Sequence, residues 1–252
     1  GNRLLIEEKL EGCEVSVFAF VNENYVSPEI AACDYKRAGD GDTGPNTGGM
    51  GAYSPPEFWT ADLAIRVRTE ILEPTVRAMT DEGCPYRGLL YTGLMITAAG
   101  PKVIEFNCRM GDPETQVILP RLKSDLLEVC YATATGSLKH SQVSWGGNTH
   151  VGVVISSNGY PDKYDVGFGI RGLNTASNYS KVFHAGTAVD ERGTIVTSGG
   201  RVLTIVGNGA DMKTATESAY RGASAIKFDG ATYRKDIGVR AMTTPPSLKT
   251  RS

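Results

Sequence analysis

The sequence lacks the features that direct a chain to a membrane, to nucleic acid or to secretion. No run of about 18 apolar residues occurs, so we expect no segment to span a bilayer. The formal net charge is −2, and the chain therefore has no basic field for nucleic acid or an anionic membrane surface. The opening residues GNRLLIEEKLEG show no charged segment followed by an apolar one, so we expect no signal peptide.

Cysteine is scarce and scattered. The five cysteines are odd in number and form no CxxC pair, which argues against a disulfide framework and against a structural zinc site. We expect free, buried thiols in a reducing compartment, with the cytoplasm as the default location. The three histidines are also spread out and form no metal set, so we interpret them as structural or surface residues.

The length of 252 residues suits one large domain or two smaller ones, and 40% hydrophobic residues suffice for a buried core. We expect an α+β fold with two parts. Residues 1–140 should form an antiparallel sheet with helices, and residues 149–242 a small antiparallel α+β domain. Residues 141–149 read as a polar connector, and 243–252 as a tail or linker.

Apolar periodicity predicts the elements of the first part. A strand run at Leu4–Ile6 is followed by a half-buried strand over 14–21, which forms a hairpin with 25–26. Residues 28–56 are rich in glycine and proline and read as a long functional loop. A helix over 61–79 is interrupted at Pro74, and 88–97 and 102–108 form a second hairpin.

Two further helices are expected at 115–122 and 125–135. Asp125 is placed to cap the start of the second helix, and Gly136 to end it. In the second part, strands are expected at 151–156, 182–184, 195–197 and 201–206. An amphipathic helix with a face of small residues should follow over 210–227.

The clearest chemical pattern is the strand that ends in VIEFNCRMGDPE. Alternate residues of a strand share a face, so Glu105, Asn107 and Arg109 should point one way. Ile104, Phe106 and Cys108 should point the other way, into a core. Carboxylate and amide oxygens suit a hard cation such as Mg²⁺, and an arginine beside them suits an anionic substrate. A solvated strand face with a Glu–Arg ion pair remains the alternative reading.

The stretch DYKRAGDGDTGPNTGGMG is the second candidate site. Its glycines permit positive φ and close backbone approach, and Lys36 and Arg37 stand beside them, so a phosphate cradle is one reading and a solvated basic turn the other. The stretch matches neither a P-loop nor a Rossmann fingerprint. Asp112 and Glu114 come just past the strand over 102–108, where they could orient Arg109 or bind an amine, and we interpret them first as helix-capping residues.

These blocks, in their order and spacing, resemble the phosphoribosylamine–glycine ligase family, also called glycinamide ribonucleotide synthetase. This is an ATP-grasp family of purine biosynthesis. IEEKLEGCEVSV, GPNTGGMGAYSP, EFNCRMGDPETQ, VFHAGT, TSGGRVL and YRKDIGVRA carry the resemblance, which covers the chain from Leu4 to about Ala241. It implies that ATP, with Mg²⁺ or Mn²⁺, activates glycine as an acyl phosphate that the amine of 5-phosphoribosylamine attacks.

The resemblance also implies residue roles. Glu105 and Asn107 match metal ligands, and Arg109 and Asp112 match catalytic positions. Nucleotide-binding positions fall on Glu7, Glu8, Leu10 and Glu14, with Glu14 at the ribose. Substrate-binding positions fall on Asp34, Lys36, Asn46, Thr47, Gly48 and Gly49, and the glycines of this loop should let backbone amides reach the sugar phosphate.

The sequence departs from the family pattern at its front. We expect a C-terminal piece that lacks the N-terminal domain and the start of the ATP-grasp module, including the flap over the ATP phosphates, and that is inactive alone. A non-catalytic fragment, or half of a split or multifunctional polypeptide, is the rival reading, and an ATP-grasp ligase of another acid or amine is a third. We expect no nucleic-acid or membrane partner. The parent chain is expected to be cytoplasmic or plastidic and open to fusion with further purine-pathway domains.

Overall fold

The computed structural model describes residues 4–139 and 142–239, and the expected tail over 243–252 lies outside them. The strands are β1 (Cys13–Asn22), β2 (Tyr25–Val26), β3 (Ile30–Asp34), β4 (Arg37–Gly39), β5 (Thr43–Asn46), β6 (Gly51–Ser54), β7 (Arg87–Thr97), β8 (Gly100–Asn107), β9 (Thr149–Ser157), β10 (Lys181–His184), β11 (Thr187–Val189), β12 (Ile195–Thr197), β13 (Arg201–Gly209) and β14 (Ala231–Thr232).

The helices are α1 (Ala61–Val67), α2 (Glu73–Asp81), α3 (Glu114–Ile118), α4 (Leu126–Thr135), α5 (Leu173–Ser177) and α6 (Met212–Ala225). A π-helical segment, η2 (Arg68–Leu72), joins α1 to α2, and two 3₁₀ turns are η1 (Asp40–Asp42) and η3 (Leu119–Arg121). In the part of the chain that the structure describes, no helix has the length and apolar character needed to cross a bilayer.

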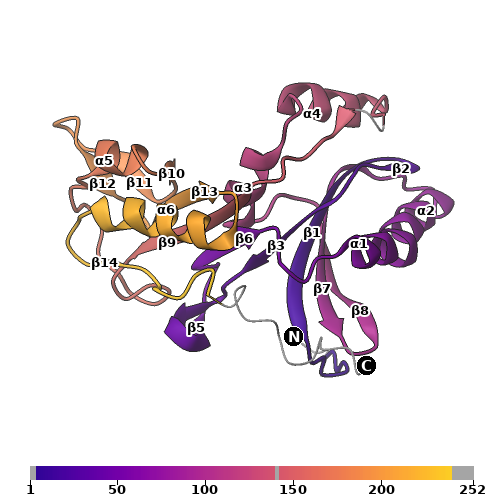
Figure 1. Ribbon diagram of the computed structural model, residues 1–252, viewed down its shortest axis with the longest axis horizontal. Helices are drawn as coiled ribbons and strands as arrows, with labels where there is room; N and C mark the ends of the chain where they lie inside the picture. Colours follow the sequence, from indigo (N-terminus) through magenta and orange to yellow (C-terminus); the bar gives the residue numbers. More distant parts are fainter. Residues whose placement is uncertain (1–3, 140–141, 240–252) are drawn as a thin grey trace.

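One antiparallel sheet of ten strands organises the fold (Figure 1), which confirms the expected antiparallel α+β class. Its order is β10-β13-β9-β6-β3-β1-β7-β8, with β14 beside β9 and β2 beside β1. β6 pairs with β9, with Gly51 opposite Val153 and Ser54 opposite His150. The sheet therefore passes through both expected parts of the chain, whose boundary near 141–149 stays a prediction.

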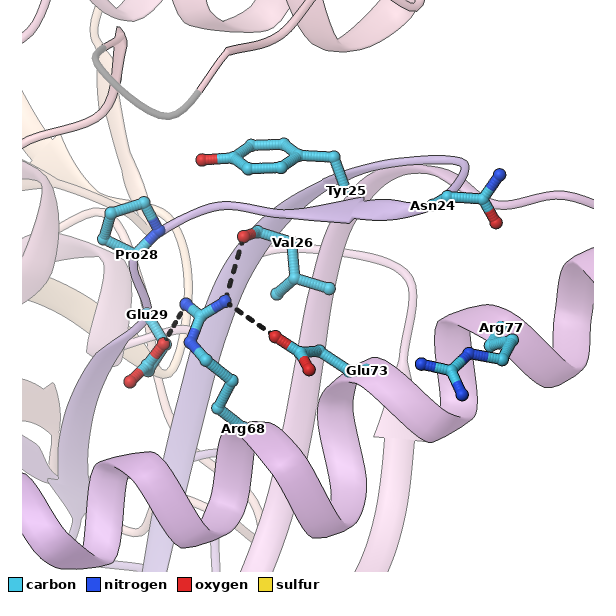
Figure 2. Close-up of a pocket in the computed structure, with 8 residues that line it drawn as sticks. All are labelled: Asn24, Tyr25, Val26, Pro28, Glu29, Arg68, Glu73 and Arg77. Carbon is cyan, nitrogen blue, oxygen red and sulfur yellow. Dashed lines mark hydrogen bonds and ion pairs between the residues drawn. The ribbon is translucent and has the colours of Figure 1, made fainter.

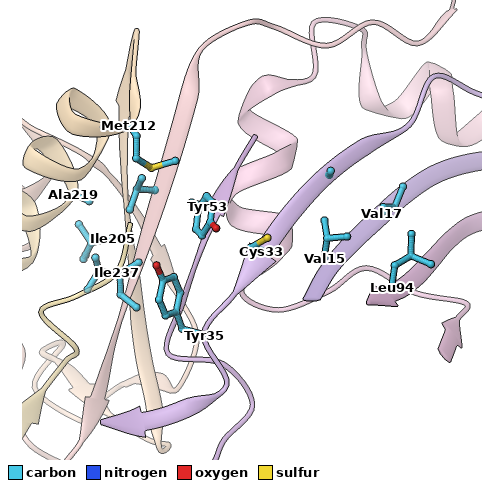
Figure 3. Packing of buried hydrophobic residues seen from close by; sticks show 14 of the residues in the cluster. Val15, Val17, Cys33, Tyr35, Tyr53, Leu94, Ile205, Met212, Ala219 and Ile237 are labelled. Carbon is cyan, nitrogen blue, oxygen red and sulfur yellow. The ribbon is translucent and has the colours of Figure 1, made fainter. Parts of the chain in front are cut away.

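The buried core is continuous along this sheet (Figure 3). One cluster contains side chains of the first strands and of the last strands and helix, among them Val15, Val17, Leu94, Tyr35, Tyr53, Ile205, Met212, Ala219 and Ile237. β1 departs from the predicted half-buried strand, because Val15 to Asn22 are buried on both faces. Phe18 and Phe20 point away from that cluster and pack in two others, beside residues of α3 and α4.

The locally encoded elements are confirmed. β1 and β2 form the first hairpin, with Val21 opposite Val26, and β7 and β8 form the second. α4 begins where the Asp125 side chain accepts the backbone N–H of Glu128 at 3.0 Å, and it ends at Gly136, which has a φ of 76°. The helix expected over 61–79 is interrupted before Pro74 by the π-helical segment.

Arg68 of that π-helical segment fixes the helices under the β1–β2 hairpin (Figure 2). Its guanidinium donates to the carbonyls of Val26 at 3.0 Å and Ser27 at 2.6 Å, and it pairs with the carboxylates of Glu29 and Glu73. Carbonyl and carboxylate oxygens of the chain itself therefore accept from this guanidinium, which lies in the pocket between β2 and α2. Arg68 thus stabilises the packing of the helices against the sheet.

Three expectations about this part are wrong. Residues 28–56 are not one long loop, because they form β3, β6 and the small β4–β5 hairpin. Leu4–Ile6 forms no strand and is at least 78% exposed, since these residues have no hydrogen-bonded neighbour strand in the structure. The five cysteines form no disulfide, but Cys84, Cys108 and Cys130 are exposed, and only Cys33 is buried.

The second part of the chain, called the second region below and described over residues 149–239, contains the expected strands and helix. It also contains β11, β14 and α5. The small face of α6 explains the close approach of this helix to the sheet. A Cβ at Gly207 of β13 would collide with the backbone of Ala215 and Ala219. Glycine on the strand and alanine on the helix therefore let the two elements pack at short range.

Candidate functional site

Strand register brings four of the candidate residues, Glu14, Asp34, Glu105 and Asn107, onto one face of the sheet. Ser16 of β1 lies opposite Ala32 of β3 and Gly93 of β7, and Gly93 lies opposite Glu105 of β8. Paired residues share a face, as do residues two apart on one strand. The polar residues of this face include Glu14, Ser16, Asp34, Tyr91, Glu105 and Asn107. Because neighbouring strands lie about 4.8 Å apart, β1 and β8 are about 10 Å apart, a distance that a small substrate can bridge.

Glu105 and Asn107 contact each other at the end of β8. The Asn107 Nδ2 donates to Glu105 Oε1 at 2.9 Å, and Glu105 is exposed while Asn107 is half-buried. Arg109 follows the strand, is exposed, and donates from Nη1 to the carbonyl of Met110 at 3.0 Å. The structure therefore places the carboxylate and the amide side by side.

The other face of β8 differs from expectation. Ile104 and Phe106 are each 43% exposed, so the prediction that they enter the core is wrong. β8 is the last strand in the sheet order, and the strand is exposed or half-buried along its whole length in the structure. Alternation along a strand predicts which residues share a face, and burial depends on what covers that face.

Lys36 forms ion pairs with two acidic candidates on neighbouring strands, Glu14 of β1 and Asp34 of β3. Its Nζ lies 2.6 Å from Glu14 Oε1 and 2.9 Å from Asp34 Oδ1. Burial would lower the pKa of Lys36, but the Asp34 charge and the hydrogen bonds to both carboxylates raise that pKa above its ordinary value. Lys36 is therefore a fixed ammonium group, and Glu14, expected at the ribose, belongs to the same cluster.

Glu114, interpreted first as a helix-capping residue, is buried against this polar face. It lies in the first turn of α3 and is 4% exposed, and its Oε1 accepts hydrogen bonds from Ser16 Oγ at 3.2 Å and Tyr91 Oη at 3.0 Å. Burial, with the Asp34 charge nearby, raises the pKa of Glu114. No sequence signal separates this buried carboxyl group from an exposed capping residue.

The glycine loop uses its own backbone amides. Thr47 N donates to Lys36 O at 2.7 Å, Gly49 N to Thr47 Oγ1 at 3.0 Å, and Met50 N to Tyr35 O at 2.7 Å. Gly48 N donates to a side chain of the second region, the Tyr160 hydroxyl, at 3.0 Å. In this structure, the N–H groups expected to meet a ligand bind protein oxygens instead. Asn46, exposed, ends β5 opposite Arg37.

Arg201, which the sequence did not single out as a candidate, joins Asp112 to this loop. Arg201 Nη1 donates to Gly48 O at 2.7 Å and to Asp112 O at 2.8 Å, and Nη2 lies 3.4 Å from Asp112 Oδ2. The Asp112 side chain also accepts from Gln116 Nε2 at 3.0 Å. The only sequence signal for Arg201 is its place in the TSGGRVL block.

The expected nucleotide segment precedes β1. Glu7 and Glu8 are exposed, Leu10 is half-buried, and residues 4–11 form neither helix nor strand. Of the four nucleotide positions, the structure brings Glu14 to the cluster around Lys36. The other three lie on the segment that leads into this strand.

Comparisons with known proteins agree with the architecture. The family model of the phosphoribosylglycinamide synthetase ATP-grasp (A) domain matches residues 1–115, and that of the C domain of the same synthetase matches residues 150–240. The phosphoribosylamine–glycine ligase of Pseudomonas aeruginosa is 50% identical over 244 residues, which are 96% of this chain and 57% of that protein.

Two further relatives extend the comparison. The trifunctional purine biosynthetic protein adenosine-3 of Gallus gallus is 50% identical over 96% of this chain, which corresponds to 24% of its own length. The crystal structure of phosphoribosylamine–glycine ligase from Thermotoga maritima superposes with a TM-score of 0.82 at 38% identity, over 92% of this chain and 57% of that one.

The chain thus spans somewhat more than half the length of the single-function ligases it resembles. Two domain models of one family cover most of the sequence, and a solved structure of that family shares the fold. The chain belongs to the phosphoribosylglycinamide synthetase family.

Proposed function

We propose that this protein takes part in the ATP-dependent ligation of glycine to 5-phosphoribosylamine. The products are glycinamide ribonucleotide, ADP and phosphate. The observation that carries this proposal is the polar sheet face, where Glu105 and Asn107 lie about two strand spacings from the cluster of Lys36, Asp34 and Glu14. Relatives named phosphoribosylamine–glycine ligase, about half identical to this chain, support the choice of substrates.

Glu105 and Asn107 fit a divalent cation. Both offer oxygen, the donor type that Mg²⁺ and Mn²⁺ prefer, and Mg²⁺ takes few protein ligands when phosphates and waters complete its shell. Among residues 4–139 and 142–239, no group of three or more His, Cys, Asp or Glu is placed to hold a metal, so this pair would bind the ion only together with phosphate. The bound ion would neutralise charge on the phosphates of ATP.

The cationic side chains fit the remaining steps. Transfer of the γ-phosphoryl group to the glycine carboxylate forms glycyl phosphate, and the amine of 5-phosphoribosylamine then displaces phosphate. We assign Arg109, which is exposed beside the metal pair, to the carboxylate and the acyl phosphate, because a guanidinium binds both in a bidentate manner. We assign Lys36, held in its charged form, to the sugar phosphate or the attacking amine's site.

Nucleotide binding is assigned to the segment before β1. Glu7, Glu8 and the Leu10 backbone would meet the adenine. Lys36 binds Oε1 of Glu14, which leaves Oε2 for a ribose hydroxyl. The loop residues Asn46 to Gly49 and Asp112 would complete the glycine and phosphoribosylamine site.

A second reading concerns the chain rather than the reaction. The chain spans 56–57% of the length of these ligases, and we propose that turnover requires the part of the ligase that the chain does not span. The chain alone would then be a non-catalytic piece of a larger or multifunctional protein. An ATP-grasp ligase for a different acid or amine is the third reading. Fusion to other purine-pathway domains is supported by the trifunctional relative.

The test compares three proteins. These are the 252-residue chain, a chimera in which the Pseudomonas aeruginosa ligase supplies the part of its length that the chain does not span, and that chimera with Glu105→Ala. Each receives ATP, Mg²⁺, fresh 5-phosphoribosylamine, and glycine or alanine, and glycinamide ribonucleotide is measured with ADP. Glu191→Ala, on the exposed β11–β12 hairpin, is the control.

We expect glycine-dependent product from the chimera, little from the chain alone, and a loss of at least 100-fold with Glu105→Ala but not with Glu191→Ala. Product from alanine at the same rate would favour the third reading. A chimera that folds and hydrolyses no ATP would refute the proposed ligase function.

A further inference from the structure

Arg201 connects two loops that are far apart in the sequence. It starts β13, and its side chain is 22% exposed. Its Nη1 donates to Gly48 O at 2.7 Å and Asp112 O at 2.8 Å, with a longer contact to Gly49 O at 3.4 Å. One guanidinium therefore sets the separation between the glycine loop and the turn that carries Asp112.

The glycine loop is shaped to receive this side chain. A Cβ at Gly48 would lie 2.9 Å from Arg201 Cζ, closer than side chains approach one another. Gly48 N donates to Tyr160 Oη while Gly48 O accepts from Arg201, so both polar groups of this residue are bound by the second region. A Cβ at Gly200 would collide with the Tyr160 ring, so Tyr160 and Arg201 approach the loop as one packed unit.

The Asp112 turn is held from the same side. Arg201 contacts both the Asp112 carbonyl and, at 3.4 Å, the Asp112 carboxylate. The ring of Pro113 lies so close to Gly49 that any Cβ there would collide with it. The turn that follows Arg109 therefore lies directly against the loop that we assign to the substrates.

We propose that Arg201 is a positioning residue for acyl transfer. It fixes the glycine loop against the Asp112 turn and thereby aligns the site for the carboxylic acid and the amine. This inference rests on the proposed function. Nη1 meets acceptors of both loops while Nη2 faces the Asp112 carboxylate, and the rigid, planar guanidinium holds both nitrogens in fixed directions, which an ammonium group on a flexible stem does not.

The role predicts a selective kinetic change. Displacing a reacting group by about 1 Å costs on the order of 100-fold in rate, so Arg201→Ala in the chimera should lower kcat/KM for glycine and 5-phosphoribosylamine by that factor. The KM for ATP should stay within about twofold, because the assigned nucleotide segment makes no contact with Arg201 among the described residues. Arg201→Lys should be intermediate, and added guanidinium ion should restore part of the activity of Arg201→Ala.

A second measurement needs no catalysis. Hydrogen exchange of the 252-residue chain should be faster in Arg201→Ala at peptides covering 46–51 and 110–113, and unchanged at α1 and α2. Arg192→Ala, an exposed arginine in the β11–β12 hairpin, is the matched control and should change neither readout.

The outcomes separate the two proposals. An inactive wild-type chimera removes the proposed function, and the exchange experiment still decides whether Arg201 positions the loop. Local exchange with no kinetic change overturns a role in the reaction. Faster exchange throughout the chain, or equal losses for ATP and for both other substrates, overturns positioning in favour of general stability.

Discussion

Arg234 is a buried, charged side chain, and its substitution tests whether contacts between the end of the described chain and the glycine loop stabilise the fold. It is 1% exposed, and its Nε and Nη2 donate to the two oxygens of Asp236 at 2.7 and 2.6 Å. Its Nη1 donates to Asp42 Oδ1 and to Arg37 O, both at 3.0 Å, and the guanidinium lies 4.7 Å from the centre of the Tyr35 ring. The side chain therefore joins the end of the described chain to the glycine loop.

The expected cost of Arg234→Ala follows from these contacts. Breaking a buried ion pair by removing one partner costs about 3–5 kcal/mol. Asp236 and Asp42 are 27% and 42% exposed, so water can solvate them once they are unpaired, which favours the lower end of that range. Arg234 and Tyr35 are both buried, so the lost contact with the ring adds about 2 kcal/mol. We therefore expect a loss of roughly 5 kcal/mol, or about 10–20 °C in the melting midpoint of a chain of this size.

Urea unfolding of the 252-residue chain measures this value. The matched control is Arg221→Ala, an exposed arginine whose guanidinium lies 5.1 Å from the Tyr179 ring, and it should cost no more than about 1 kcal/mol. A double-mutant cycle of Arg234→Ala with Asp236→Ala should give a coupling of about 1–3 kcal/mol. If Arg234→Ala costs no more than the control, the buried cluster does not hold the loop and the reasoning fails.

Three further changes test the site. Burial raises the pKa of Glu114, so its contribution to stability is present below the ordinary carboxyl pKa of 4.5 and is lost as the pH rises through the raised value. Glu114→Gln should accordingly gain stability relative to wild type from pH 4 to 8 in urea unfolding, and the opposite trend would refute the shift. Gly49→Ala should cost about 1–3 kcal/mol in the same assay, because φ is +116° and the Cβ would meet the Pro113 ring, whereas Gly147→Ala, in open space, should be neutral. Glu105→Gln should weaken Mn²⁺ binding in the presence of ATP at least tenfold, as followed by electron paramagnetic resonance of the chimera; unchanged binding would remove this residue from the metal site.

Elements encoded by neighbouring residues were predicted well. The two hairpins, the cap at Asp125 and the end of α4 at Gly136 depend on side chains within a few positions of one another. The interruption near Pro74 follows from the missing N–H of proline. The face shared by Glu105 and Asn107 follows from strand periodicity alone.

Features that depend on distant partners were not predicted. β3 and β6 pair with β1 and β9, and no pattern within residues 28–56 reports those partners. Local sequence predicts Glu114 as a capping residue. Its buried site arises from hydrogen bonds with Ser16, 98 positions away, and with Tyr91, 23 positions away. Alternation along the strand predicted that Ile104 and Phe106 would be buried. They are exposed, because burial requires another element to pack against their face of β8.

The conformation of the glycine loop also depends on residues that are distant in the sequence. Positive φ and absent side chains suggested a loop shaped for a ligand, yet the closest neighbours of Gly48 and Gly49 are Arg201 and Pro113 of the chain itself. At the start of the loop, Gly41 N donates to Asp236, which is held by Arg234. Side chains from residues 160–236 therefore contact both ends of the loop. The glycines permit these contacts, and the loop can present a ligand site only while the second region holds it against the sheet.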